Sequence, residues 1–204
     1  MERARFGVLI SGSGTNLQAI LDACADGRIA GEVAVVISNC EDAYGLERAR
    51  IAGVPAIFID PADCAGADDY NHRIREALEL ENVECVVMAG YMKLLGADVL
   101  DAFPMRVVNI HPALLPSFAG AHGIRDAYDY GVKVTGVTVH FADQAFDHGP
   151  IIAQEAVEIR DDDTLETLEA RIHVVEHRLY PEVLAALAEG RVTVEGRTVR
   201  ISPR

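Results

Sequence analysis

An asparagine and a histidine two residues apart form the pattern in this sequence that is best suited to chemistry. Asn109 and His111 stand at the end of the apolar run 107–110 and are followed by Pro112. Residues two apart in a strand point to the same side, so both side chains can face one pocket if the strand extends that far. An amide beside an imidazole is suited to stabilising a developing oxyanion. The alternative is a strand end where Asn109 caps backbone groups and His111 is a hydrogen-bonded turn residue.

A carboxylate with a related use lies further along the chain, in the segment 143–150. Asp147 can orient His111 or relay a proton through water. The two residues are far apart in sequence, so spacing alone does not establish their contact. An Asp-His-Gly-Pro stretch is also typical of a turn without a chemical role.

A glycine-rich turn, 12–16, follows the first apolar run and precedes a helical pattern. Free backbone N–H groups at the start of a helix form a ready phosphate site, and Thr15 and Asn16 add side-chain hydrogen bonds. The third glycine of a dinucleotide fingerprint is missing, because position 17 is Leu, and no nucleoside triphosphate P-loop is present. By itself, the turn is equally well explained as a helix cap that binds no ligand.

Two histidine patterns resemble metal sites. His173 and His177 are spaced i, i+4 on an expected helix, but the glutamate of an H-E-x-x-H motif is absent. His140, Asp147 and His148 form a second conceivable ligand set. Solvated or structural roles are the more common outcome for both patterns, so no metal is expected.

The elements that would position these residues alternate between strands and helices in the first half. Apolar runs predict strands, and periodic or capped segments between them predict helices; the strands are 6–10, 33–37, 56–59, 85–88 and 107–110, and the helices start near Leu17 and cover 46–52 and 68–80. This alternation predicts an α/β fold, an open, mostly parallel twisted sheet flanked by helices.

The second half changes character. The segment 111–123 reads as a loop, and 132–141 and 151–159 as long strands. An apparent capping box, Asp163 with Glu166, opens a long helix that Pro181 is expected to kink and Gly190 to end. A terminal β-hairpin follows over 192–201. We expect one domain over 1–204, with 1–105 as the nucleotide-phosphate-binding half and 106–204 as the folate and catalytic half.

Composition excludes several classes of function. The net charge of −14 is unfavourable for binding nucleic acid or an anionic membrane, and any anionic ligand would need a local binding device. No apolar run is long enough to span a bilayer, and the first apolar run is too short for a signal peptide, so a cytoplasmic protein is expected. The four cysteines form no C-x-x-C pair and are expected to be reduced, mostly buried thiols.

Several segments, taken in order, closely resemble the phosphoribosylglycinamide formyltransferase family of purine biosynthesis, and the match runs nearly end to end. They are the Ser-Gly-x-Gly-Thr-Asn-Leu-Gln-Ala-Ile opening at 11–20, the stretch 38–49, Met-Ala-Gly-Tyr-Met at 88–92, Asn-Ile-His-Pro-Ala-Leu-Leu-Pro-Ser-Phe at 109–118, and 140–152 with its Asp-x-Gly-Pro. The resemblance implies transfer of a formyl group from 10-formyltetrahydrofolate to the amine of glycinamide ribonucleotide. It implies no metal, and a monomer or homodimer.

The resemblance also implies roles for individual residues. Asn109, His111 and Asp147 would be catalytic. The acceptor would be bound by Gly14, Thr15, Asn16, Gly90, Pro112 and Glu176, and the formyl-folate by Met92, Lys93, Leu94, Leu95, Asn109, Asp143 and Asp147. Two positions depart from the family: Ala67 replaces a basic residue that often contacts folate, and Ala119 replaces a Pro or Lys.

Three alternative functions share parts of this pattern. A formyltetrahydrofolate hydrolase uses a similar core on water but usually carries an extra N-terminal domain. A methionyl-tRNA formyltransferase usually adds a C-terminal RNA-binding domain, and the acidic charge disfavours tRNA. A nucleotide-binding module built on the turn 12–16 alone would have no catalytic activity.

Overall fold

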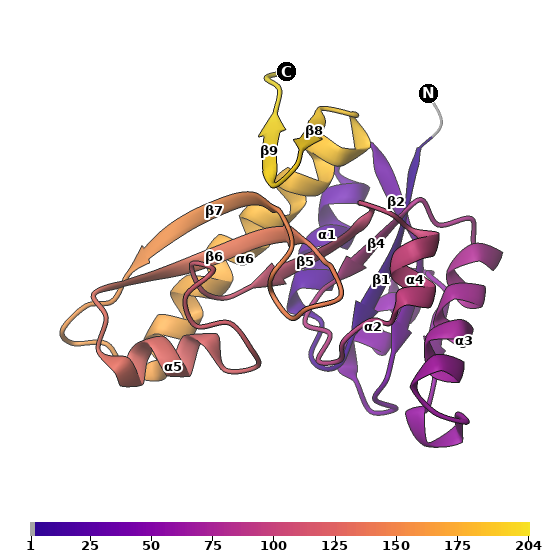
Figure 1. Ribbon diagram of the computed structural model, residues 1–204, viewed down its shortest axis with the longest axis horizontal. Helices are drawn as coiled ribbons and strands as arrows, with labels where there is room; N and C mark the ends of the chain where they lie inside the picture. The colour runs from indigo at the N-terminus through magenta and orange to yellow at the C-terminus, as the bar shows by residue number, and fades with distance from the viewer. Residues whose placement is uncertain (1–2) are drawn as a thin grey trace.

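The computed structural model describes residues 3–204 (Figure 1). Its main feature is a seven-stranded sheet with the order β3-β2-β1-β4-β5-β6-β7. The strands are β1 Ala4–Ile10, β2 Gly31–Ser38, β3 Ala56–Phe58, β4 Cys85–Met88, β5 Val107–His111, β6 Val134–Phe141 and β7 Ile151–Glu158. The first five are parallel, whereas β6 and β7 pair antiparallel. The α/β class and the mostly parallel sheet expected from the sequence are confirmed.

Helices cover both faces of the parallel part of the sheet. They are α1 Thr15–Ala25, α2 Tyr44–Ile51, α3 Ala67–Leu80, α4 Ala97–Ala102, α5 Gly123–Tyr130 and α6 Leu165–Ala188, with a short 3-10 turn, η1, at Pro61–Asp63. A separate hairpin of β8 Val192–Glu195 and β9 Thr198–Ile201 follows α6, as predicted. The sequence patterns do not indicate α4, η1 or α5, and the predicted loop 111–123 includes Gly123, where α5 begins.

Strand alternation divides the apolar interior into two layers. Val8 and Ile10 of β1 belong to a cluster with α1, α2 and α6, whereas Leu9 between them belongs to a cluster with α3 and α4. Because successive strand residues point to opposite faces, a strand covered by helices on both sides must be apolar throughout. The continuous apolar runs in the sequence therefore follow directly from a sheet that is buried on both faces.

The start of α6 corrects one prediction. Thr164, and not Asp163, is the N-cap, and its side chain accepts the N–H of Thr167 while the Thr167 hydroxyl accepts the N–H of Thr164. Asp163 instead forms an ion pair with Arg171, and this ion pair lowers the pKa of the Asp163 carboxyl. The helix continues through Pro181, and Gly190, at φ 66°, follows the C-cap as expected.

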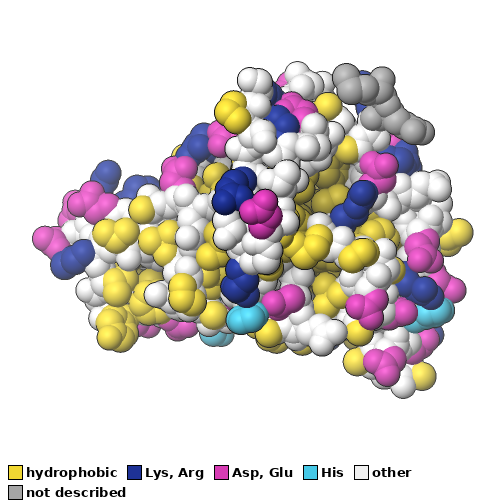
Figure 2. Space-filling model, turned by 45° about the horizontal axis from the view of Figure 1, so that its top comes forward, with side chains coloured by type: hydrophobic (Ala, Val, Ile, Leu, Met, Phe, Trp, Pro, Cys, Tyr) yellow, Lys and Arg dark blue, Asp and Glu magenta, His cyan; other side chains and the backbone are white. Residues whose placement is uncertain are grey.

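The surface and the cysteines add two details. Figure 2 shows acidic and basic side chains lying side by side on the face it presents, so the excess of negative charge does not form one uniform field there. No helix in residues 3–204 combines the length and apolar character that crossing a membrane would require. The four cysteines are free and half-buried, so the prediction of mostly buried thiols overstated their burial.

Tyr180 connects the long helix to the centre of the sheet. Its fully buried hydroxyl lies 3.1 Å from the carbonyl oxygen of Met88 on β4 and 2.9 Å from that of Val108 on β5. The hydroxyl shares its single proton between these two acceptors, which come from neighbouring parallel strands. Burial raises the pKa of Tyr180 well above that of a free tyrosine, so the donor proton is retained.

We therefore expect Tyr180→Phe to lower the free energy of unfolding by about 1–3 kcal/mol, because a buried hydrogen bond is lost while its acceptors stay buried. Urea unfolding at pH 7 measures this change. Tyr130→Phe is the matched control. Because Tyr130 is 79% exposed, this variant should be as stable as the wild type. Equal stabilities for the Tyr180 variant and the wild type would show that the hydroxyl does not brace the sheet.

Candidate active site

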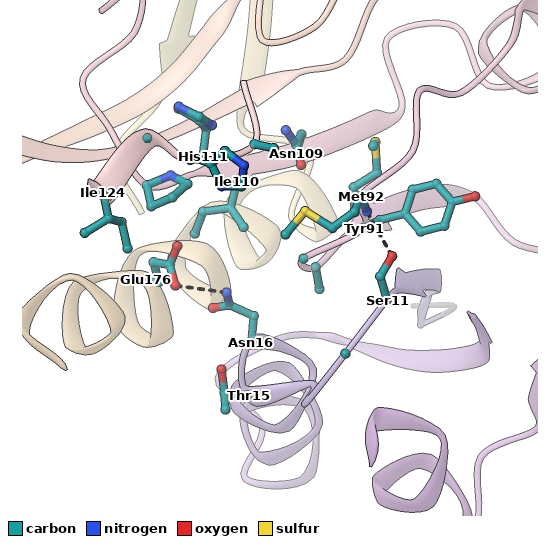
Figure 3. A pocket seen from close by; sticks show the side chains of 18 of the residues that line it. Ser11, Thr15, Asn16, Tyr91, Met92, Asn109, Ile110, His111, Ile124 and Glu176 are labelled. Atoms are coloured by element: carbon teal, nitrogen blue, oxygen red, sulfur yellow. Dashed lines mark hydrogen bonds between the residues drawn. The ribbon is translucent and has the colours of Figure 1, made fainter. Parts of the chain in front are cut away.

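A cavity of about 910 Å³ opens at the carboxyl ends of β1, β4 and β5, where ligands of open α/β sheets bind. The cavity extends between the start of α1 and the middle of α6 (Figure 3). Most of the expected site residues line it: Gly14, Thr15, Asn16, Gly90, Met92, Asn109, His111, Pro112, Asp147 and Glu176. The fold thus gathers five separate segments of the sequence at the carboxyl ends of these strands.

The three residues expected to be catalytic meet in this cavity. Strand β5 extends to His111, so Asn109 and His111 lie on the same strand end. The loop after β6 brings Asp147 back to them: its Oδ1 accepts from Asn109 Nδ2 at 3.3 Å, and its Oδ2 lies 3.4 Å from His111 Nδ1. The contact that sequence spacing could not establish is therefore present.

The other ring nitrogen of His111 also faces an acceptor. Its Nε2 donates to the carbonyl oxygen of Phe118 at 2.8 Å. Since Phe118 O has no proton to give, this contact assigns a proton to Nε2. The Asp147 carboxylate faces the opposite nitrogen, and a ring that is protonated on both sides would satisfy both acceptors.

His140 is a fourth member of the cluster. Antiparallel pairing places it directly opposite Asn109, and its Nε2 lies 3.2 Å from Asn109 Nδ2. His140 Nδ1 donates to the carbonyl oxygen of Phe141 at 2.8 Å, so a neutral ring presents Nε2 as an acceptor and fixes the orientation of the Asn109 amide. The sequence analysis considered His140 only as a metal ligand, because the register of β5 on β6 is not visible in the sequence.

Asp147 is held as an ionised carboxylate. Burial acts to raise the pKa of its carboxyl, but the hydrogen bonds that the carboxylate accepts, among them the one from the N–H of Gly120 at 2.8 Å, outweigh burial and lower the pKa below the usual aspartate value. The backbone of Asp147 lies at φ 52°, a conformation uncommon for residues other than glycine. The local backbone thus carries strain at the residue whose carboxylate collects these contacts.

The glycine-rich turn leads into α1 as predicted. Gly14 has φ 70°, and a Cβ on it would lie 2.7 Å from the Cα of Gly45, so no other residue fits there. The neighbouring Asn16 is buried, and its Nδ2 donates to Glu176 Oε2 at 3.1 Å. Glu176 also accepts from His173 Nδ1 at 2.9 Å. The first turn of α1 and the middle of α6 therefore share one wall of the cavity.

The segment 90–95 forms another wall, although only part of it reaches the cavity. Gly90, Tyr91 and Met92 line the space, and Met92 is 65% exposed. The structure places three expected folate contacts elsewhere: Leu95 is buried in the core, Lys93 Nζ lies 5.8 Å from the ring centroid of Tyr70, and Leu94 is partly exposed outside the cavity lining. Asp143 also lies outside the lining, where it pairs with His148 at 2.9 Å.

The cavity also contains residues that the sequence analysis did not select. They include Ser11, Tyr91, His122, Arg125 and Glu169. Arg125 and His122 come from α5 and its N-cap. The sequence predicted a loop over 111–123 and no helix after it, so no pattern directed attention to them. Glu169, His173 and Glu176 recur at helical spacing on one face of α6, which is a signal the sequence did contain.

Neither histidine pattern assembles a metal site in the part of the chain that the structure describes, where no group of three or more His, Cys, Asp or Glu residues is arranged to hold an ion. The rings of His173 and His177 instead stack, with centroids 6.0 Å apart and an interplanar angle of 8°. His148 instead contacts Asp143 through its Nδ1.

Comparisons with known proteins point to one family. Residues 4–184 match a family model described as formyl transferase. The chain is similar to the phosphoribosylglycinamide formyltransferase of Bacillus subtilis, with 40% identity over 90% of this chain and 94% of the relative. It is also similar to the enzyme of the same name from Mycobacterium tuberculosis, with 45% identity over 96% of this chain and 90% of the relative.

A solved structure shows the same fold. The crystal structure of glycinamide ribonucleotide transformylase 1 from Symbiobacterium toebii superposes with a TM-score of 0.96 at 54% identity. The superposition covers 98% of this chain and 94% of that chain, so the sheet, the long helix and the terminal hairpin are all included.

The histidines on α6 give a prediction about pH. The hydrogen bond to Glu176 raises the pKa of His173 above 6.5, whereas burial lowers the pKa of its stacked neighbour His177 below 6.5. The folded-state pKa of His173 is therefore raised, so its ion pair stabilises the fold fully below the unfolded pKa, and that stability is lost as the pH rises through the folded pKa.

We expect NMR titration to give His173 a pKa above 6.5 and His177 a pKa below 6.5. Glu176→Gln should lower the pKa of His173, because the hydrogen bond that raises it is weakened. Assigning the two signals requires His173→Gln and His177→Gln. A His173 pKa that does not change in the Glu176 variant would contradict the contact.

Proposed function

The chain belongs to the formyl transferase family, and from this membership and its site we propose that it transfers the formyl group of 10-formyltetrahydrofolate to the amine of glycinamide ribonucleotide, a step of de novo purine biosynthesis. The observation that carries the proposal is the placement of Asn109, His111 and Asp147 in the same cavity as the glycine-rich turn. The part of this cavity at Asn109, His111 and Asp147 is suited to acyl transfer, and the part at the glycine-rich turn is suited to binding a phosphate.

The acceptor binds at the start of α1. The backbone N–H groups of Gly14, Thr15 and Asn16 receive the phosphate, because the first N–H groups of a helix have no partner within the helix. Asn16 Oδ1 is buried and has no hydrogen-bond partner among residues 3–204, so it can accept from a hydroxyl or amide of the ligand. Glu176 provides a second acceptor beside it, and Gly90 and Pro112 line the path toward His111.

The formyl donor binds at the other end, against the segments 92–95 and 143–147. Met92 and Phe146 line the cavity there and are 65% and 59% exposed, which leaves apolar surface for the flat rings of a folate to cover. The other residues expected to bind folate lie on these same two segments, behind the lining residues or along the outer rim of the cavity, and support the lining residues from there: Lys93, Leu94, Leu95 and Asp143.

The reaction requires one bond to form and one to break. The acceptor amine attacks the formyl carbon, a tetrahedral oxyanion forms, and the bond from that carbon to the folate nitrogen then breaks. The proton that the amine loses is returned to the folate nitrogen, so no net proton is consumed. Asn109 Nδ2 and the His111 ring stabilise the oxyanion by donating hydrogen bonds to it. Without substrate, Asn109 Nδ2 donates to Asp147 and His111 Nε2 donates to the carbonyl oxygen of Phe118, so the oxyanion must replace one of these acceptors.

Asp147 acts through its charge. A carboxyl with a lowered pKa stays ionised at neutral pH and is a weak base, so it is poorly suited to holding the amine proton. It is well suited to stabilising a protonated His111 and to orienting a water that carries the proton onward. The same carboxylate fixes the Asn109 amide, so a single residue organises both oxyanion donors.

We expect Asn109→Ala and Asp147→Asn each to lower kcat by about 100-fold or more, the usual cost of losing one oxyanion-stabilising contact or its support. Steady-state kinetics measures this loss, and thermal unfolding checks that the fold survives. Asp162→Asn, an exposed aspartate outside the cavity lining, is the control and should retain full activity. A variant of either site residue with nearly full kcat would remove that residue from the mechanism.

A single assay separates the proposed function from its alternatives. The protein is incubated with 10-formyltetrahydrofolate in the presence and absence of glycinamide ribonucleotide, and loss of the formyl donor is followed. Loss that requires the acceptor supports transfer. Loss without the acceptor would mean a formyltetrahydrofolate hydrolase, and no loss under either condition would leave only a binding module.

A further inference from the structure

Ser11 joins two walls of the cavity that otherwise belong to different parts of the fold. It follows β1 directly and precedes the glycine-rich turn. Its hydroxyl oxygen accepts the backbone N–H of Met92 at 2.9 Å, as Figure 3 shows. The Ser11 N–H donates to the carbonyl oxygen of Gly90 at 3.1 Å. Both bonds hold the segment 90–92 against the end of β1.

The direction of the Ser11 hydroxyl is set by a third residue. The hydroxyl donates to Asn39 Oδ1, just after β2, at 2.6 Å. A serine hydroxyl has one proton, so this bond turns the oxygen lone pairs toward the Met92 N–H. Asn39, Ser11 and Met92 thus form a chain of hydrogen bonds with one consistent polarity.

The segment 90–95 depends on such contacts because it has no regular secondary structure. Gly90 begins it in the left-handed region, at φ 76°. Two other anchors lead to α3: the Tyr91 hydroxyl lies 2.7 Å from that of Tyr70, and the N–H of Gly96 donates to Asn71 at 2.7 Å. The Ser11 contacts, by contrast, lead to the turn that would bind phosphate.

We infer that Ser11 is a positioning residue that fixes the segment 92–95, against which the folate would bind, relative to the glycine-rich turn 12–16, which would bind the phosphate. It thereby sets the distance between the formyl carbon and the attacking amine. The inference rests on the proposed function, since it assigns the donor to one wall and the acceptor to the other. Displacing two bound reactants by about 1 Å can cost about 100-fold in rate even when each is still bound.

This role has a distinct kinetic signature. The acceptor phosphate is held by backbone N–H groups that Ser11→Ala leaves in place, so binding of glycinamide ribonucleotide alone should change by less than about twofold. Reaction within the complex of both substrates should slow by about 10-fold or more, because the Met92 N–H loses its acceptor and the donor wall shifts. A purely structural serine would instead weaken both ligands and lower the melting temperature in parallel.

The test compares Ser11→Ala, Ser11→Thr and Ser202→Ala in the full-length protein. Calorimetry measures the binding of glycinamide ribonucleotide and of tetrahydrofolate separately, and single-turnover kinetics measures transfer with both substrates saturating. Ser11→Thr keeps the hydroxyl and should restore most of the rate. Ser202→Ala, an exposed serine after β9, is the matched control and should behave like the wild type.

Asn39→Ala provides an independent test that does not depend on the folding of the Ser11 variant. Asn39→Ala removes the acceptor of the Ser11 hydroxyl and should slow transfer about threefold when it is the only substitution. It should have no further effect when combined with Ser11→Ala, because the two residues act through one hydrogen bond. A single-turnover rate for Ser11→Ala within twofold of the wild type would overturn the inference. So would parallel weakening of both ligands that Ser11→Thr does not rescue. Absence of transfer by the wild type would instead refute the proposed function, and this inference with it.

Discussion

The pairing of β5 with β6 is the constraint on which the whole site depends. β5 is the last parallel strand, and its antiparallel partner places His140 opposite Asn109 and then returns the chain through the loop that carries Asp147. A shift of one residue in this register would turn His140 to the other face of the sheet and remove the acceptor that orients the Asn109 amide. The geometry of the proposed catalytic residues is therefore specified by the strand pairing as much as by the side chains.

The charge of the protein and the charge of its proposed acceptor oppose each other. A chain with a net charge of −14 repels a phosphate at long range, but salt screens that field within about 10 Å. Short-range donors then decide binding, and in the proposed function these are the backbone N–H groups at the start of α1. The acidic surface is compatible with an anionic ligand only because this binding device is local.

Much of the fold and of the site could be predicted because the signals were local. Apolar runs marked the strands, and the Asn-Ile-His-Pro segment lay where the last parallel strand ends. The errors had physical causes. α5 begins at a glycine inside a segment rich in Pro and Gly, and Thr164 competed with Asp163 for the helix cap. The roles of His140 and Ser11 depend on strand register and on contacts between distant segments, which no spacing in the sequence reveals.

The close approach of Gly14 and Gly45 has a consequence for redesign of this protein. A Cβ on Gly14 would lie 2.7 Å from the Gly45 Cα, and one on Gly45 would lie 2.3 Å from Ile10 Cδ1 and 3.3 Å from the Gly14 Cα. Neither glycine has room for a side chain, so neither position can be changed to recognise a different acceptor. A change of acceptor preference must therefore come from other cavity residues, such as Glu169, His173 and Glu176 on α6.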